Sequence, residues 1–90
     1  MQDVMANSYS TQVTSTSTNV TAFSAHAARL VFLQADSSNT SAMQILGTGC
    51  TAGISLTAGS FAPTLWVDDL SKLSYKAGTS GDKINVLVLY

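Results

Sequence analysis

Short apolar stretches alternate with turn-forming residues from residue 19 to the end of the chain. Apolar residues that recur at every second position line one face of a strand, so this pattern predicts about six to eight short strands. The expected strands lie near 19–24, 28–34, 42–46, 53–58, 61–67, 73–77 and 83–90. Gly, Ser, Asn and Asp predict loops between them, most clearly at 36–41 and 78–82. The pattern is typical of a small antiparallel β-sandwich or jelly-roll-like barrel.

Three of these strands carry expectations about burial. The nearly continuous apolar run at 28–34 predicts a strand that is buried on both faces. In the segment 53–58, where apolar and polar residues alternate, the inward residues should be Ile54, Leu56 and Ala58. The last strand is also apolar on both faces, with Ile84, Val86, Val88 and Tyr90 on one and Leu87 and Leu89 on the other. It therefore needs a central position in a sheet or a subunit interface, because an exposed strand of this kind would aggregate.

The segment 61–67 should form an edge or irregular strand, because Pro63 has no N–H to give to a central ladder. If its neighbours Leu65 and Val67 face the core, Trp66 faces outward and becomes a candidate contact residue. A change of register at Pro63 would instead place Trp66 in the core. Both possibilities remain open at the level of the sequence.

One helical turn is predicted by Asp68-Asp69-Leu70-Ser71-Lys72-Leu73. Asp68 is the expected N-cap, since an aspartate side chain can accept hydrogen bonds from the first free N–H groups of a helix. A single turn would bury Leu70 and Leu73. Adjacent aspartates on such a turn point about 100° apart, which is a poor arrangement for shared acid–base catalysis.

Residues 1–18 are polar, rich in Ser and Thr, and nearly without large apolar side chains. Their alternation is compatible with an extended strand, but the segment cannot bury a face by itself. We expect an extended N-terminal arm over 1–18 that becomes ordered against a neighbouring molecule, followed by a sandwich domain over 19–90. A disordered tail is the alternative.

Composition restricts the function. Charged residues make up 10% of the chain, Glu is absent, and the net charge is −1. The four basic residues are scattered, which argues against binding to nucleic acid through a basic stripe. No apolar run is long enough to span a bilayer, and the N-terminus does not resemble a secretory signal, so we expect folding in a reducing cytosol. Surfaces of soluble proteins are usually about 25–35% charged, so we expect partners to cover much of this one.

Candidate chemistry is sparse. Cys50 and His26 are the single cysteine and the single histidine, and neither lies in a recognisable catalytic motif. We expect a structural role for His26 and an inert, buried Cys50. Calcium at Asp36 with Asn39, or at Asp82, would lack the carboxylates of a dedicated site. The glycines around Cys50 do not have the spacing of a phosphate-binding loop. We therefore expect no catalytic residue, no metal and no cofactor.

Over roughly residues 20–90, the order and spacing of several short motifs resemble small β-sandwich auxiliary virion proteins of tailed bacteriophages, of the capsid decoration (cement) or head-fibre type. The matching stretches are Arg29-Leu30-Val31, Ile45-Leu46-Gly47, Gly53-Ile54-Ser55-Leu56-Thr57-Ala58-Gly59, Asp69-Leu70-Ser71-Lys72-Leu73 and Ser80-Gly81-Asp82-Lys83-Ile84-Asn85-Val86. The resemblance does not account for the N-terminal arm, and its pattern contains no catalytic residue.

The resemblance implies a non-enzymatic structural protein, assembled in the host cytoplasm and carried on the virion. It would decorate or cement the capsid as a homo-oligomer, with a trimer as the expected form, bound to the major capsid protein or another virion protein. The candidate interface residues are Trp66, Phe61, Leu87, Leu89, Tyr90, Tyr9 and Val13. The alternative is a carbohydrate- or receptor-binding module of a fibre or tail, with Trp66 and Tyr75 stacking on sugar rings.

Overall fold

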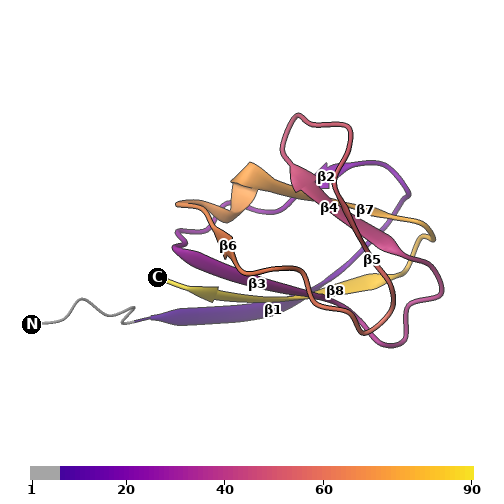
Figure 1. Ribbon diagram of the computed structural model, residues 1–90, viewed down its shortest axis with the longest axis horizontal. Helices are drawn as coiled ribbons and strands as arrows, with labels where there is room; N and C mark the ends of the chain where they lie inside the picture. The colour runs from indigo at the N-terminus through magenta and orange to yellow at the C-terminus, as the bar shows by residue number, and fades with distance from the viewer. Residues whose placement is uncertain (1–6) are drawn as a thin grey trace, which may run out of the picture.

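The computed structural model describes residues 7–90 and folds them into two antiparallel four-stranded sheets (Figure 1). The first sheet has the order β1–β8–β3–β6, with strands β1 (Ser8–Thr14), β8 (Lys83–Leu89), β3 (Leu30–Ala35) and β6 (Leu65–Trp66). The second has the order β2–β7–β4–β5, with strands β2 (Thr21–Ala22), β7 (Leu73–Ala77), β4 (Met43–Gly47) and β5 (Ile54–Leu56). The predicted small antiparallel sandwich with one helical turn, η1 (Leu70–Lys72), is confirmed.

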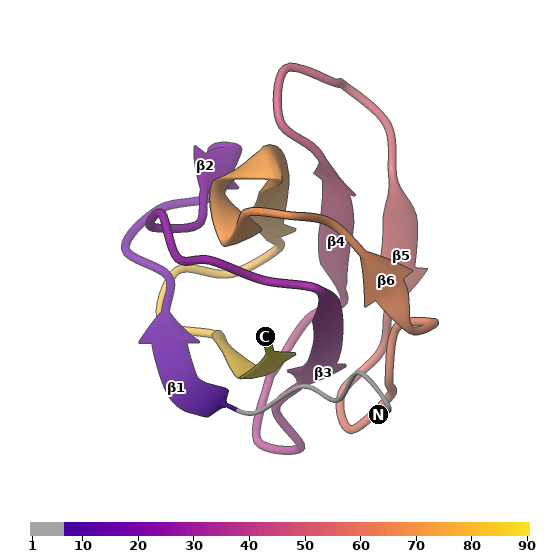
Figure 2. The ribbon, with the colours of Figure 1, turned by 90° about the vertical axis from the view of Figure 1, so that its left-hand side faces the viewer.

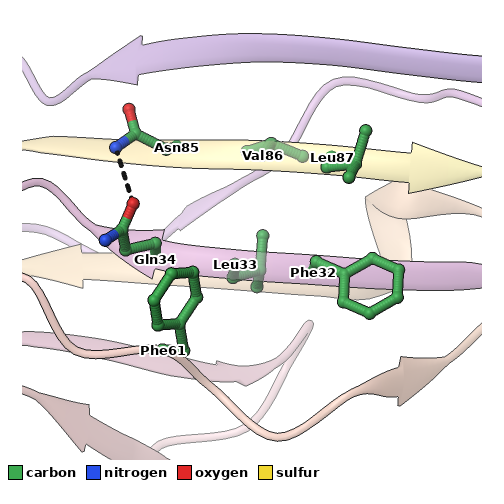
Figure 3. Close-up of a pocket in the computed structure, with 7 residues that line it drawn as sticks. All are labelled: Phe32, Leu33, Gln34, Phe61, Asn85, Val86 and Leu87. Carbon is green, nitrogen blue, oxygen red and sulfur yellow. Dashed lines mark hydrogen bonds between the residues drawn. The ribbon is translucent and has the colours of Figure 1, made fainter.

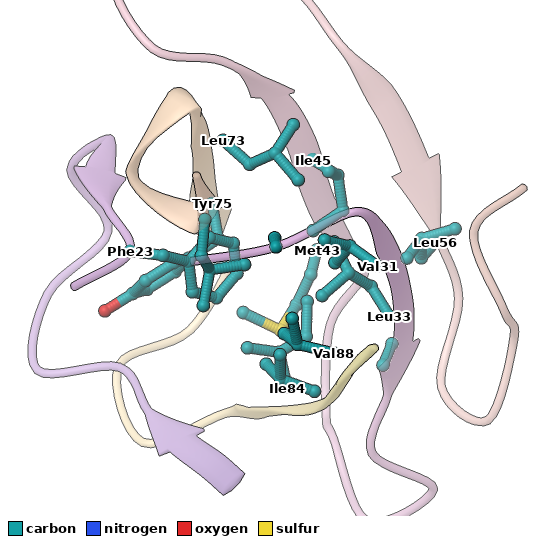
Figure 4. Packing of buried hydrophobic residues seen from close by; sticks show 14 of the residues in the cluster. Phe23, Val31, Leu33, Met43, Ile45, Leu56, Leu73, Tyr75, Ile84 and Val88 are labelled. Carbon is teal, nitrogen blue, oxygen red and sulfur yellow. The ribbon is translucent and has the colours of Figure 1, made fainter. Parts of the chain in front are cut away.

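The core lies between the two sheets (Figures 2 and 4). The first sheet contributes the inward residues of β3 and β8, such as Val31, Leu33 and Ile84, which are at most 1% exposed. Met43 of β4 and Leu56 of β5 cover them from the second sheet. Burial of one such aliphatic side chain stabilises the fold by about 1.5–3 kcal/mol, so this layer is the main source of stability.

Strand β8 lies in the centre of the first sheet. The sequence predicted either this position or a subunit interface for it. It pairs with β1 along one side and with β3 along the other. Its inward residues Ile84, Val86 and Val88 are buried, whereas Leu87 on the opposite face is 41% exposed. The central position satisfies the backbone of an apolar strand on both sides, but it leaves one apolar face of that strand uncovered.

The expected arm is corrected over the residues that the structure describes. Residues 8–14 are strand β1, which pairs with β8 in one continuous register from Ser8–Leu89 to Thr14–Lys83. Ser15 is buried, and its Oγ donates to the carbonyl of Asp82 at 2.9 Å. The polar strand β1 is stabilised by backbone hydrogen bonds to β8, a segment that lies far from it in the sequence. The sandwich therefore begins well before residue 19, and only residues 1–6 of the expected arm lie outside the described residues.

The helical turn is capped by Asp69 rather than by Asp68, which corrects the predicted cap. Asp69 has an extended backbone, and its Oδ1 accepts hydrogen bonds from the N–H (2.9 Å) and the Oγ (2.7 Å) of Ser71. These bonds lower the pKa of Asp69. Leu70 and Leu73 are buried, as predicted. Asp68 instead stays exposed and forms an ion pair with Lys72.

Strand β5 is shorter than the predicted 53–58, and two of its three expected inward residues are exposed. Leu56 is buried opposite Met43, whereas Ile54 is 44% exposed and Ala58 lies beyond the strand in a turn. The reason is position: β5 is the edge of its sheet and pairs only with β4. Alternation identified the side of the strand that Ile54 occupies, but the edge leaves that side open.

Candidate functional site

Strands β3 and β8 place apolar side chains on the outer face of the first sheet, away from the core. Their register puts Phe32 opposite Leu87 and Leu30 opposite Leu89. Cross-strand partners share a face, so these four residues form one patch. The buried residues of both strands lie on the other face. The expectation that 28–34 is buried on both faces is therefore corrected, because Leu30 and Phe32 are only partly buried.

Two aromatic residues from the long β5–β6 connection and β6 extend this patch. Trp66 pairs with Leu30, and Phe61 forms an isolated bridge with Gln34. Their side chains are 73% and 69% exposed, the highest values among the large apolar residues of the part described. Their neighbours Ala62, Leu65 and Val67 pack against the core. Trp66 thus faces outward, which is one of the two orientations that the sequence left open.

We call this set the outer apolar surface. Its members are Leu30, Phe32, Phe61, Trp66, Leu87 and Leu89. Between Phe32, Phe61 and Leu87 it is hollowed by a groove of about 170 Å³ (Figure 3). A second, shallower hollow of about 220 Å³ lies between Trp66 and Arg29. Contiguous exposed apolar patches in soluble proteins commonly mark binding sites.

A row of hydrogen-bonded polar side chains borders the outer apolar surface at one end. Gln12 Nε2 donates to Asn85 Oδ1 at 2.8 Å, and Asn85 Nδ2 donates to Gln34 Oε1 at 3.3 Å and to Asp36 Oδ1 at 3.2 Å. Strands β1, β3 and β8 of the first sheet supply Gln12, Gln34 and Asn85, and Asp36 directly follows β3. The bonds fix the side chains and leave further donors and acceptors, such as Gln12 Oε1, facing solvent.

Electrostatics around the surface are modest. Hydrogen bonds from the Oγ and the N–H of Ser38, and a further one from Asn85, lower the pKa of Asp36. At the second hollow, which Asp68 lines together with Trp66, Asp68 Oδ1 lies 2.6 Å from Lys72 Nζ. This contact lowers the pKa of the Asp68 carboxyl and raises the pKa of the Lys72 amine. All three groups therefore remain charged near neutral pH, and none of them belongs to the outer apolar surface.

The predicted contact residues fall into two groups. Trp66, Phe61, Leu87 and Leu89 lie together on the outer apolar surface. The others, Val13, Tyr9 and Tyr90, lie on the inward side of the first sheet: Val13 and Tyr90 pack against the core. They do not join the outer apolar surface.

His26 stands beside two of these inward residues. Its ring stacks on Tyr9 with 4.1 Å between centroids and meets the edge of Tyr90 at 5.0 Å. Its backbone N–H donates to Asp69 at 3.3 Å, and its carbonyl accepts from the N–H of Leu70 at 2.9 Å. The residue therefore links the ends of β1 and β8 to the helical turn.

Two other expectations are corrected. Cys50 is exposed, not buried, because it lies in the loop that leaves β4 rather than in a strand. Tyr75, expected to stack on sugars in the alternative function, is 7% exposed and packs against Phe23 in the core. Within residues 7–90, no three His, Cys, Asp or Glu side chains come together in an arrangement that could hold a metal ion. Over the same residues, no helix is long and apolar enough to cross a membrane.

Sequence reasoning missed Phe32 and the polar row. The signal for Phe32 was present, because it alternates with the buried Val31 and Leu33. The polar row carried a weaker signal: Gln34 follows Phe32 by two positions, and Asn85 precedes Leu87 by two. Only the register of β3 on β8 shows that these two pairs are neighbours.

Comparison of the chain with models of protein families, with curated protein sequences and with solved structures found no match.

Proposed function

We propose that this chain is a non-enzymatic structural protein of a phage particle, which attaches to the capsid through the outer apolar surface. The observation that carries the proposal is the exposure of Trp66, Phe61 and Leu87 on one face of one sheet. Removing such side chains from water drives protein association. Tryptophan and other large side chains at the centre of a contact commonly dominate its energy.

The surroundings of the surface support a protein partner. The six residues of the outer apolar surface are uncharged, and the charged Arg29 and Asp68 lie beside it at the hollow next to Trp66, so docking on the centre requires no ion to be buried. The polar row around Asn85 provides hydrogen-bonding groups at the border, where solvent remains accessible. A partner with an apolar centre and polar rim, such as the major capsid protein or another virion protein, would fit this distribution. The protein would assemble onto the particle in the host cytoplasm.

The proposal includes association between copies. The resemblance described above points to a trimer, and several copies joined together would bind a shell with avidity even if each contact were weak. The low charge of the chain favours contact between identical molecules, since there is little net repulsion to overcome.

The experiment uses particles of the virus whose genome encodes the chain. We expect purified particles to contain the protein at a fixed copy number, measured by quantitative mass spectrometry. Particles assembled with the Phe61→Ser, Trp66→Ser double variant should carry at least about tenfold less, since two anchors of an apolar contact are lost.

Ile54→Ser is the matched control. Ile54 is another exposed apolar residue, 44% exposed, but it lies on the second sheet. Particles made with this variant should keep the normal copy number. Absence of the protein from purified particles, or normal attachment of the double variant, would contradict the proposal.

A second candidate function is glycan binding by a fibre or tail module. The observation that favours it is the groove of Figure 3, which is lined by the aromatic rings of Phe32 and Phe61 and by the amides of Gln34 and Asn85. An aromatic face and a planar amide are the groups that sugar rings and hydroxyls contact. A glycan array probed with the purified protein tests it: selective binding that is lost in Phe61→Ala but kept in Ile54→Ser would favour this function over capsid attachment.

A further inference from the structure

Strand β1 is the long open edge of the sandwich. It pairs with β8 over seven residues, whereas the other edge strands, β2, β5 and β6, have two, three and two residues. Short edge strands are one way in which proteins avoid pairing between sheets. Within the described chain, β1 is therefore the edge with most capacity to pair with another strand.

The hydrogen bonds of β1 show which backbone groups face outward. Asn7 and Tyr90 exchange two backbone bonds, of 2.9 and 3.0 Å, and Ser15 donates to Asp82 at 2.9 Å. Bonding alternates along an antiparallel pair, so the odd-numbered residues from 7 to 15 bond to β8. The N–H and C=O groups that point away from β8 belong to Ser8, Ser10, Gln12 and Thr14, all of which are exposed.

No common protective device occurs on this edge. Natural edges are often blocked by a lysine, a proline, an inward charge or a bulge. Residues 8–14 contain no charged residue and no proline, and the register with β8 runs without interruption. The strand is also too polar to be explained by burial against its own core, since only Thr11 and Val13 are partly buried.

We propose that the β1 edges of two copies pair antiparallel about a two-fold axis at Thr11. In this register Ser8 lies opposite Thr14 of the partner subunit, and Ser10 lies opposite Gln12 of the partner subunit. All four outward residues of each strand then bond, which gives about eight backbone hydrogen bonds. A shift of the register by two residues in either direction would leave one residue at an end of each strand unpaired.

The side chains favour a second copy as the occupant. An edge that meets its own copy must not place like charges together, and β1 has none. On the inward side, Tyr9 would lie opposite Val13 of the partner subunit, a pairing of an aromatic with a β-branched residue that stabilises sheets. Such a contact is isologous, so it closes at two copies rather than three.

The paired edges would join two first sheets into one eight-stranded sheet. Because the axis is perpendicular to the sheet, both outer apolar surfaces would lie on the same side of the dimer. This deepens the self-association part of the proposed function and rests on that part alone. It keeps the association between copies but gives two copies, not the three that the resemblance implies, and the dimer presents two docking surfaces in one plane.

The test is a cross-link that depends on the register. Thr11 would face itself across the axis at a Cα separation of about 4.5 Å, which is within the range of a disulfide. We expect Thr11→Cys, in a Cys50→Ser background, to form a disulfide-linked dimer under mild oxidation. Tyr9→Cys in the same background is the control and should remain unlinked alone, but should link when mixed with Val13→Cys.

Light scattering measures the state of the unlinked protein. We expect a mass of twice 9.4 kDa for the natural chain and a loss of the dimer in Ser10→Lys, with an unchanged circular-dichroism spectrum. A monomer or a trimer would overturn the inference, as would a dimer in which Thr11→Cys does not cross-link. Since Ser10→Lys tests the edge and the Phe61→Ser, Trp66→Ser variant tests the outer apolar surface, failure of one is distinguishable from failure of the other.

Discussion

Individual polar side chains hold the loops of this sandwich in place. The Asp82 carboxylate accepts hydrogen bonds from the N–H of Thr40 at 3.1 Å and of Ser41 at 3.0 Å, although Asp82 lies in a different loop. Asn39 donates to the carbonyl of Lys83 at 2.8 Å and accepts from its N–H at 2.7 Å. The β3–β4 loop is thus fixed to the start of β8. The bonds to the Asp82 carboxylate are charge-assisted and are therefore stronger than hydrogen bonds between neutral groups.

Acid should destabilise the protein through its aspartates. The pKa values of Asp36, Asp68 and Asp69 lie below the ordinary value of 3.8 in the folded state. The unfolded chain therefore binds more protons as the pH falls toward and below 3.8, and the stability that these groups contribute is lost in that range. We expect the midpoint of urea denaturation to be nearly constant from about pH 7 to 5 and to fall below about pH 4.

Asp69→Asn tests the contribution of one group to this acid limb. Asparagine keeps an N-cap oxygen for Ser71 but cannot titrate. The variant should therefore show a shallower loss of stability below pH 4 than the natural chain, with the same helical turn. An acid limb of unchanged slope would show that the Ser71 hydrogen bonds do not link protonation to folding.

At the scale of elements, β8 organises the first sheet. The backbone groups of its odd-numbered residues bond to β3, and those of its even-numbered residues bond to β1. The side chains of the even-numbered residues point inward and form one side of the core. Strand β1 is the opposite case, since it is mainly polar and exposed. It contributes backbone hydrogen bonds more than apolar burial, so its stability depends on its ladder with β8.

Proline substitutions at adjacent positions distinguish the two edges of β1. The N–H of Thr11 faces β8, whereas the N–H of Ser10 faces away from it. Thr11→Pro should lower the free energy of unfolding by about 1–3 kcal/mol, because a ladder bond is lost and a carbonyl of β8 loses its partner. Ser10→Pro is the control and should cost less, measured by urea denaturation of dilute protein. Equal losses would contradict the alternation of bonds along β1.

At the scale of the whole molecule, the first sheet carries apolar side chains on both faces but uses only one for its own core. The inner layer around Leu33 and Met43 is closed by the second sheet. The outer layer around Phe32 and Leu87 has no third layer over it within the described chain. We therefore expect stability to depend on the inner face of these strands and binding to depend on their outer face.

Substitutions on the two faces should have different effects on stability. Leu33→Ala, in the core, should lower the free energy of unfolding by about 2–5 kcal/mol, since it removes buried contacts and leaves a cavity. The Phe61→Ser, Trp66→Ser double variant should change it by less than about 1 kcal/mol, since both side chains are already in water. Urea denaturation measures both. A large loss in the double variant would show that the outer apolar surface belongs to the folding core.

The sequence predicted local features well where they depend on neighbours in the chain. Alternation located β7 at 73–77 and turn residues located the loop at 36–41, whereas the orientation of Trp66 was left open until the structure placed it outward. It failed where exposure depends on distant segments. Ile54 lies on the side of its strand that the alternation indicates, but the edge of the sheet leaves it exposed. Cys50 is exposed because it lies in the loop that follows β4.

By itself the sequence determined the class of fold, because period-two alternation and turn residues are properties of adjacent positions. The tertiary structure alone decided which strands are neighbours: it placed the polar β1 beside β8 and gathered Phe61, Trp66 and Leu87 on one surface. Strand order in a sandwich arises from hydrogen bonds between segments up to about eighty residues apart. No local pattern contains that pairing, so only the folded chain defines the candidate surface and the open edge.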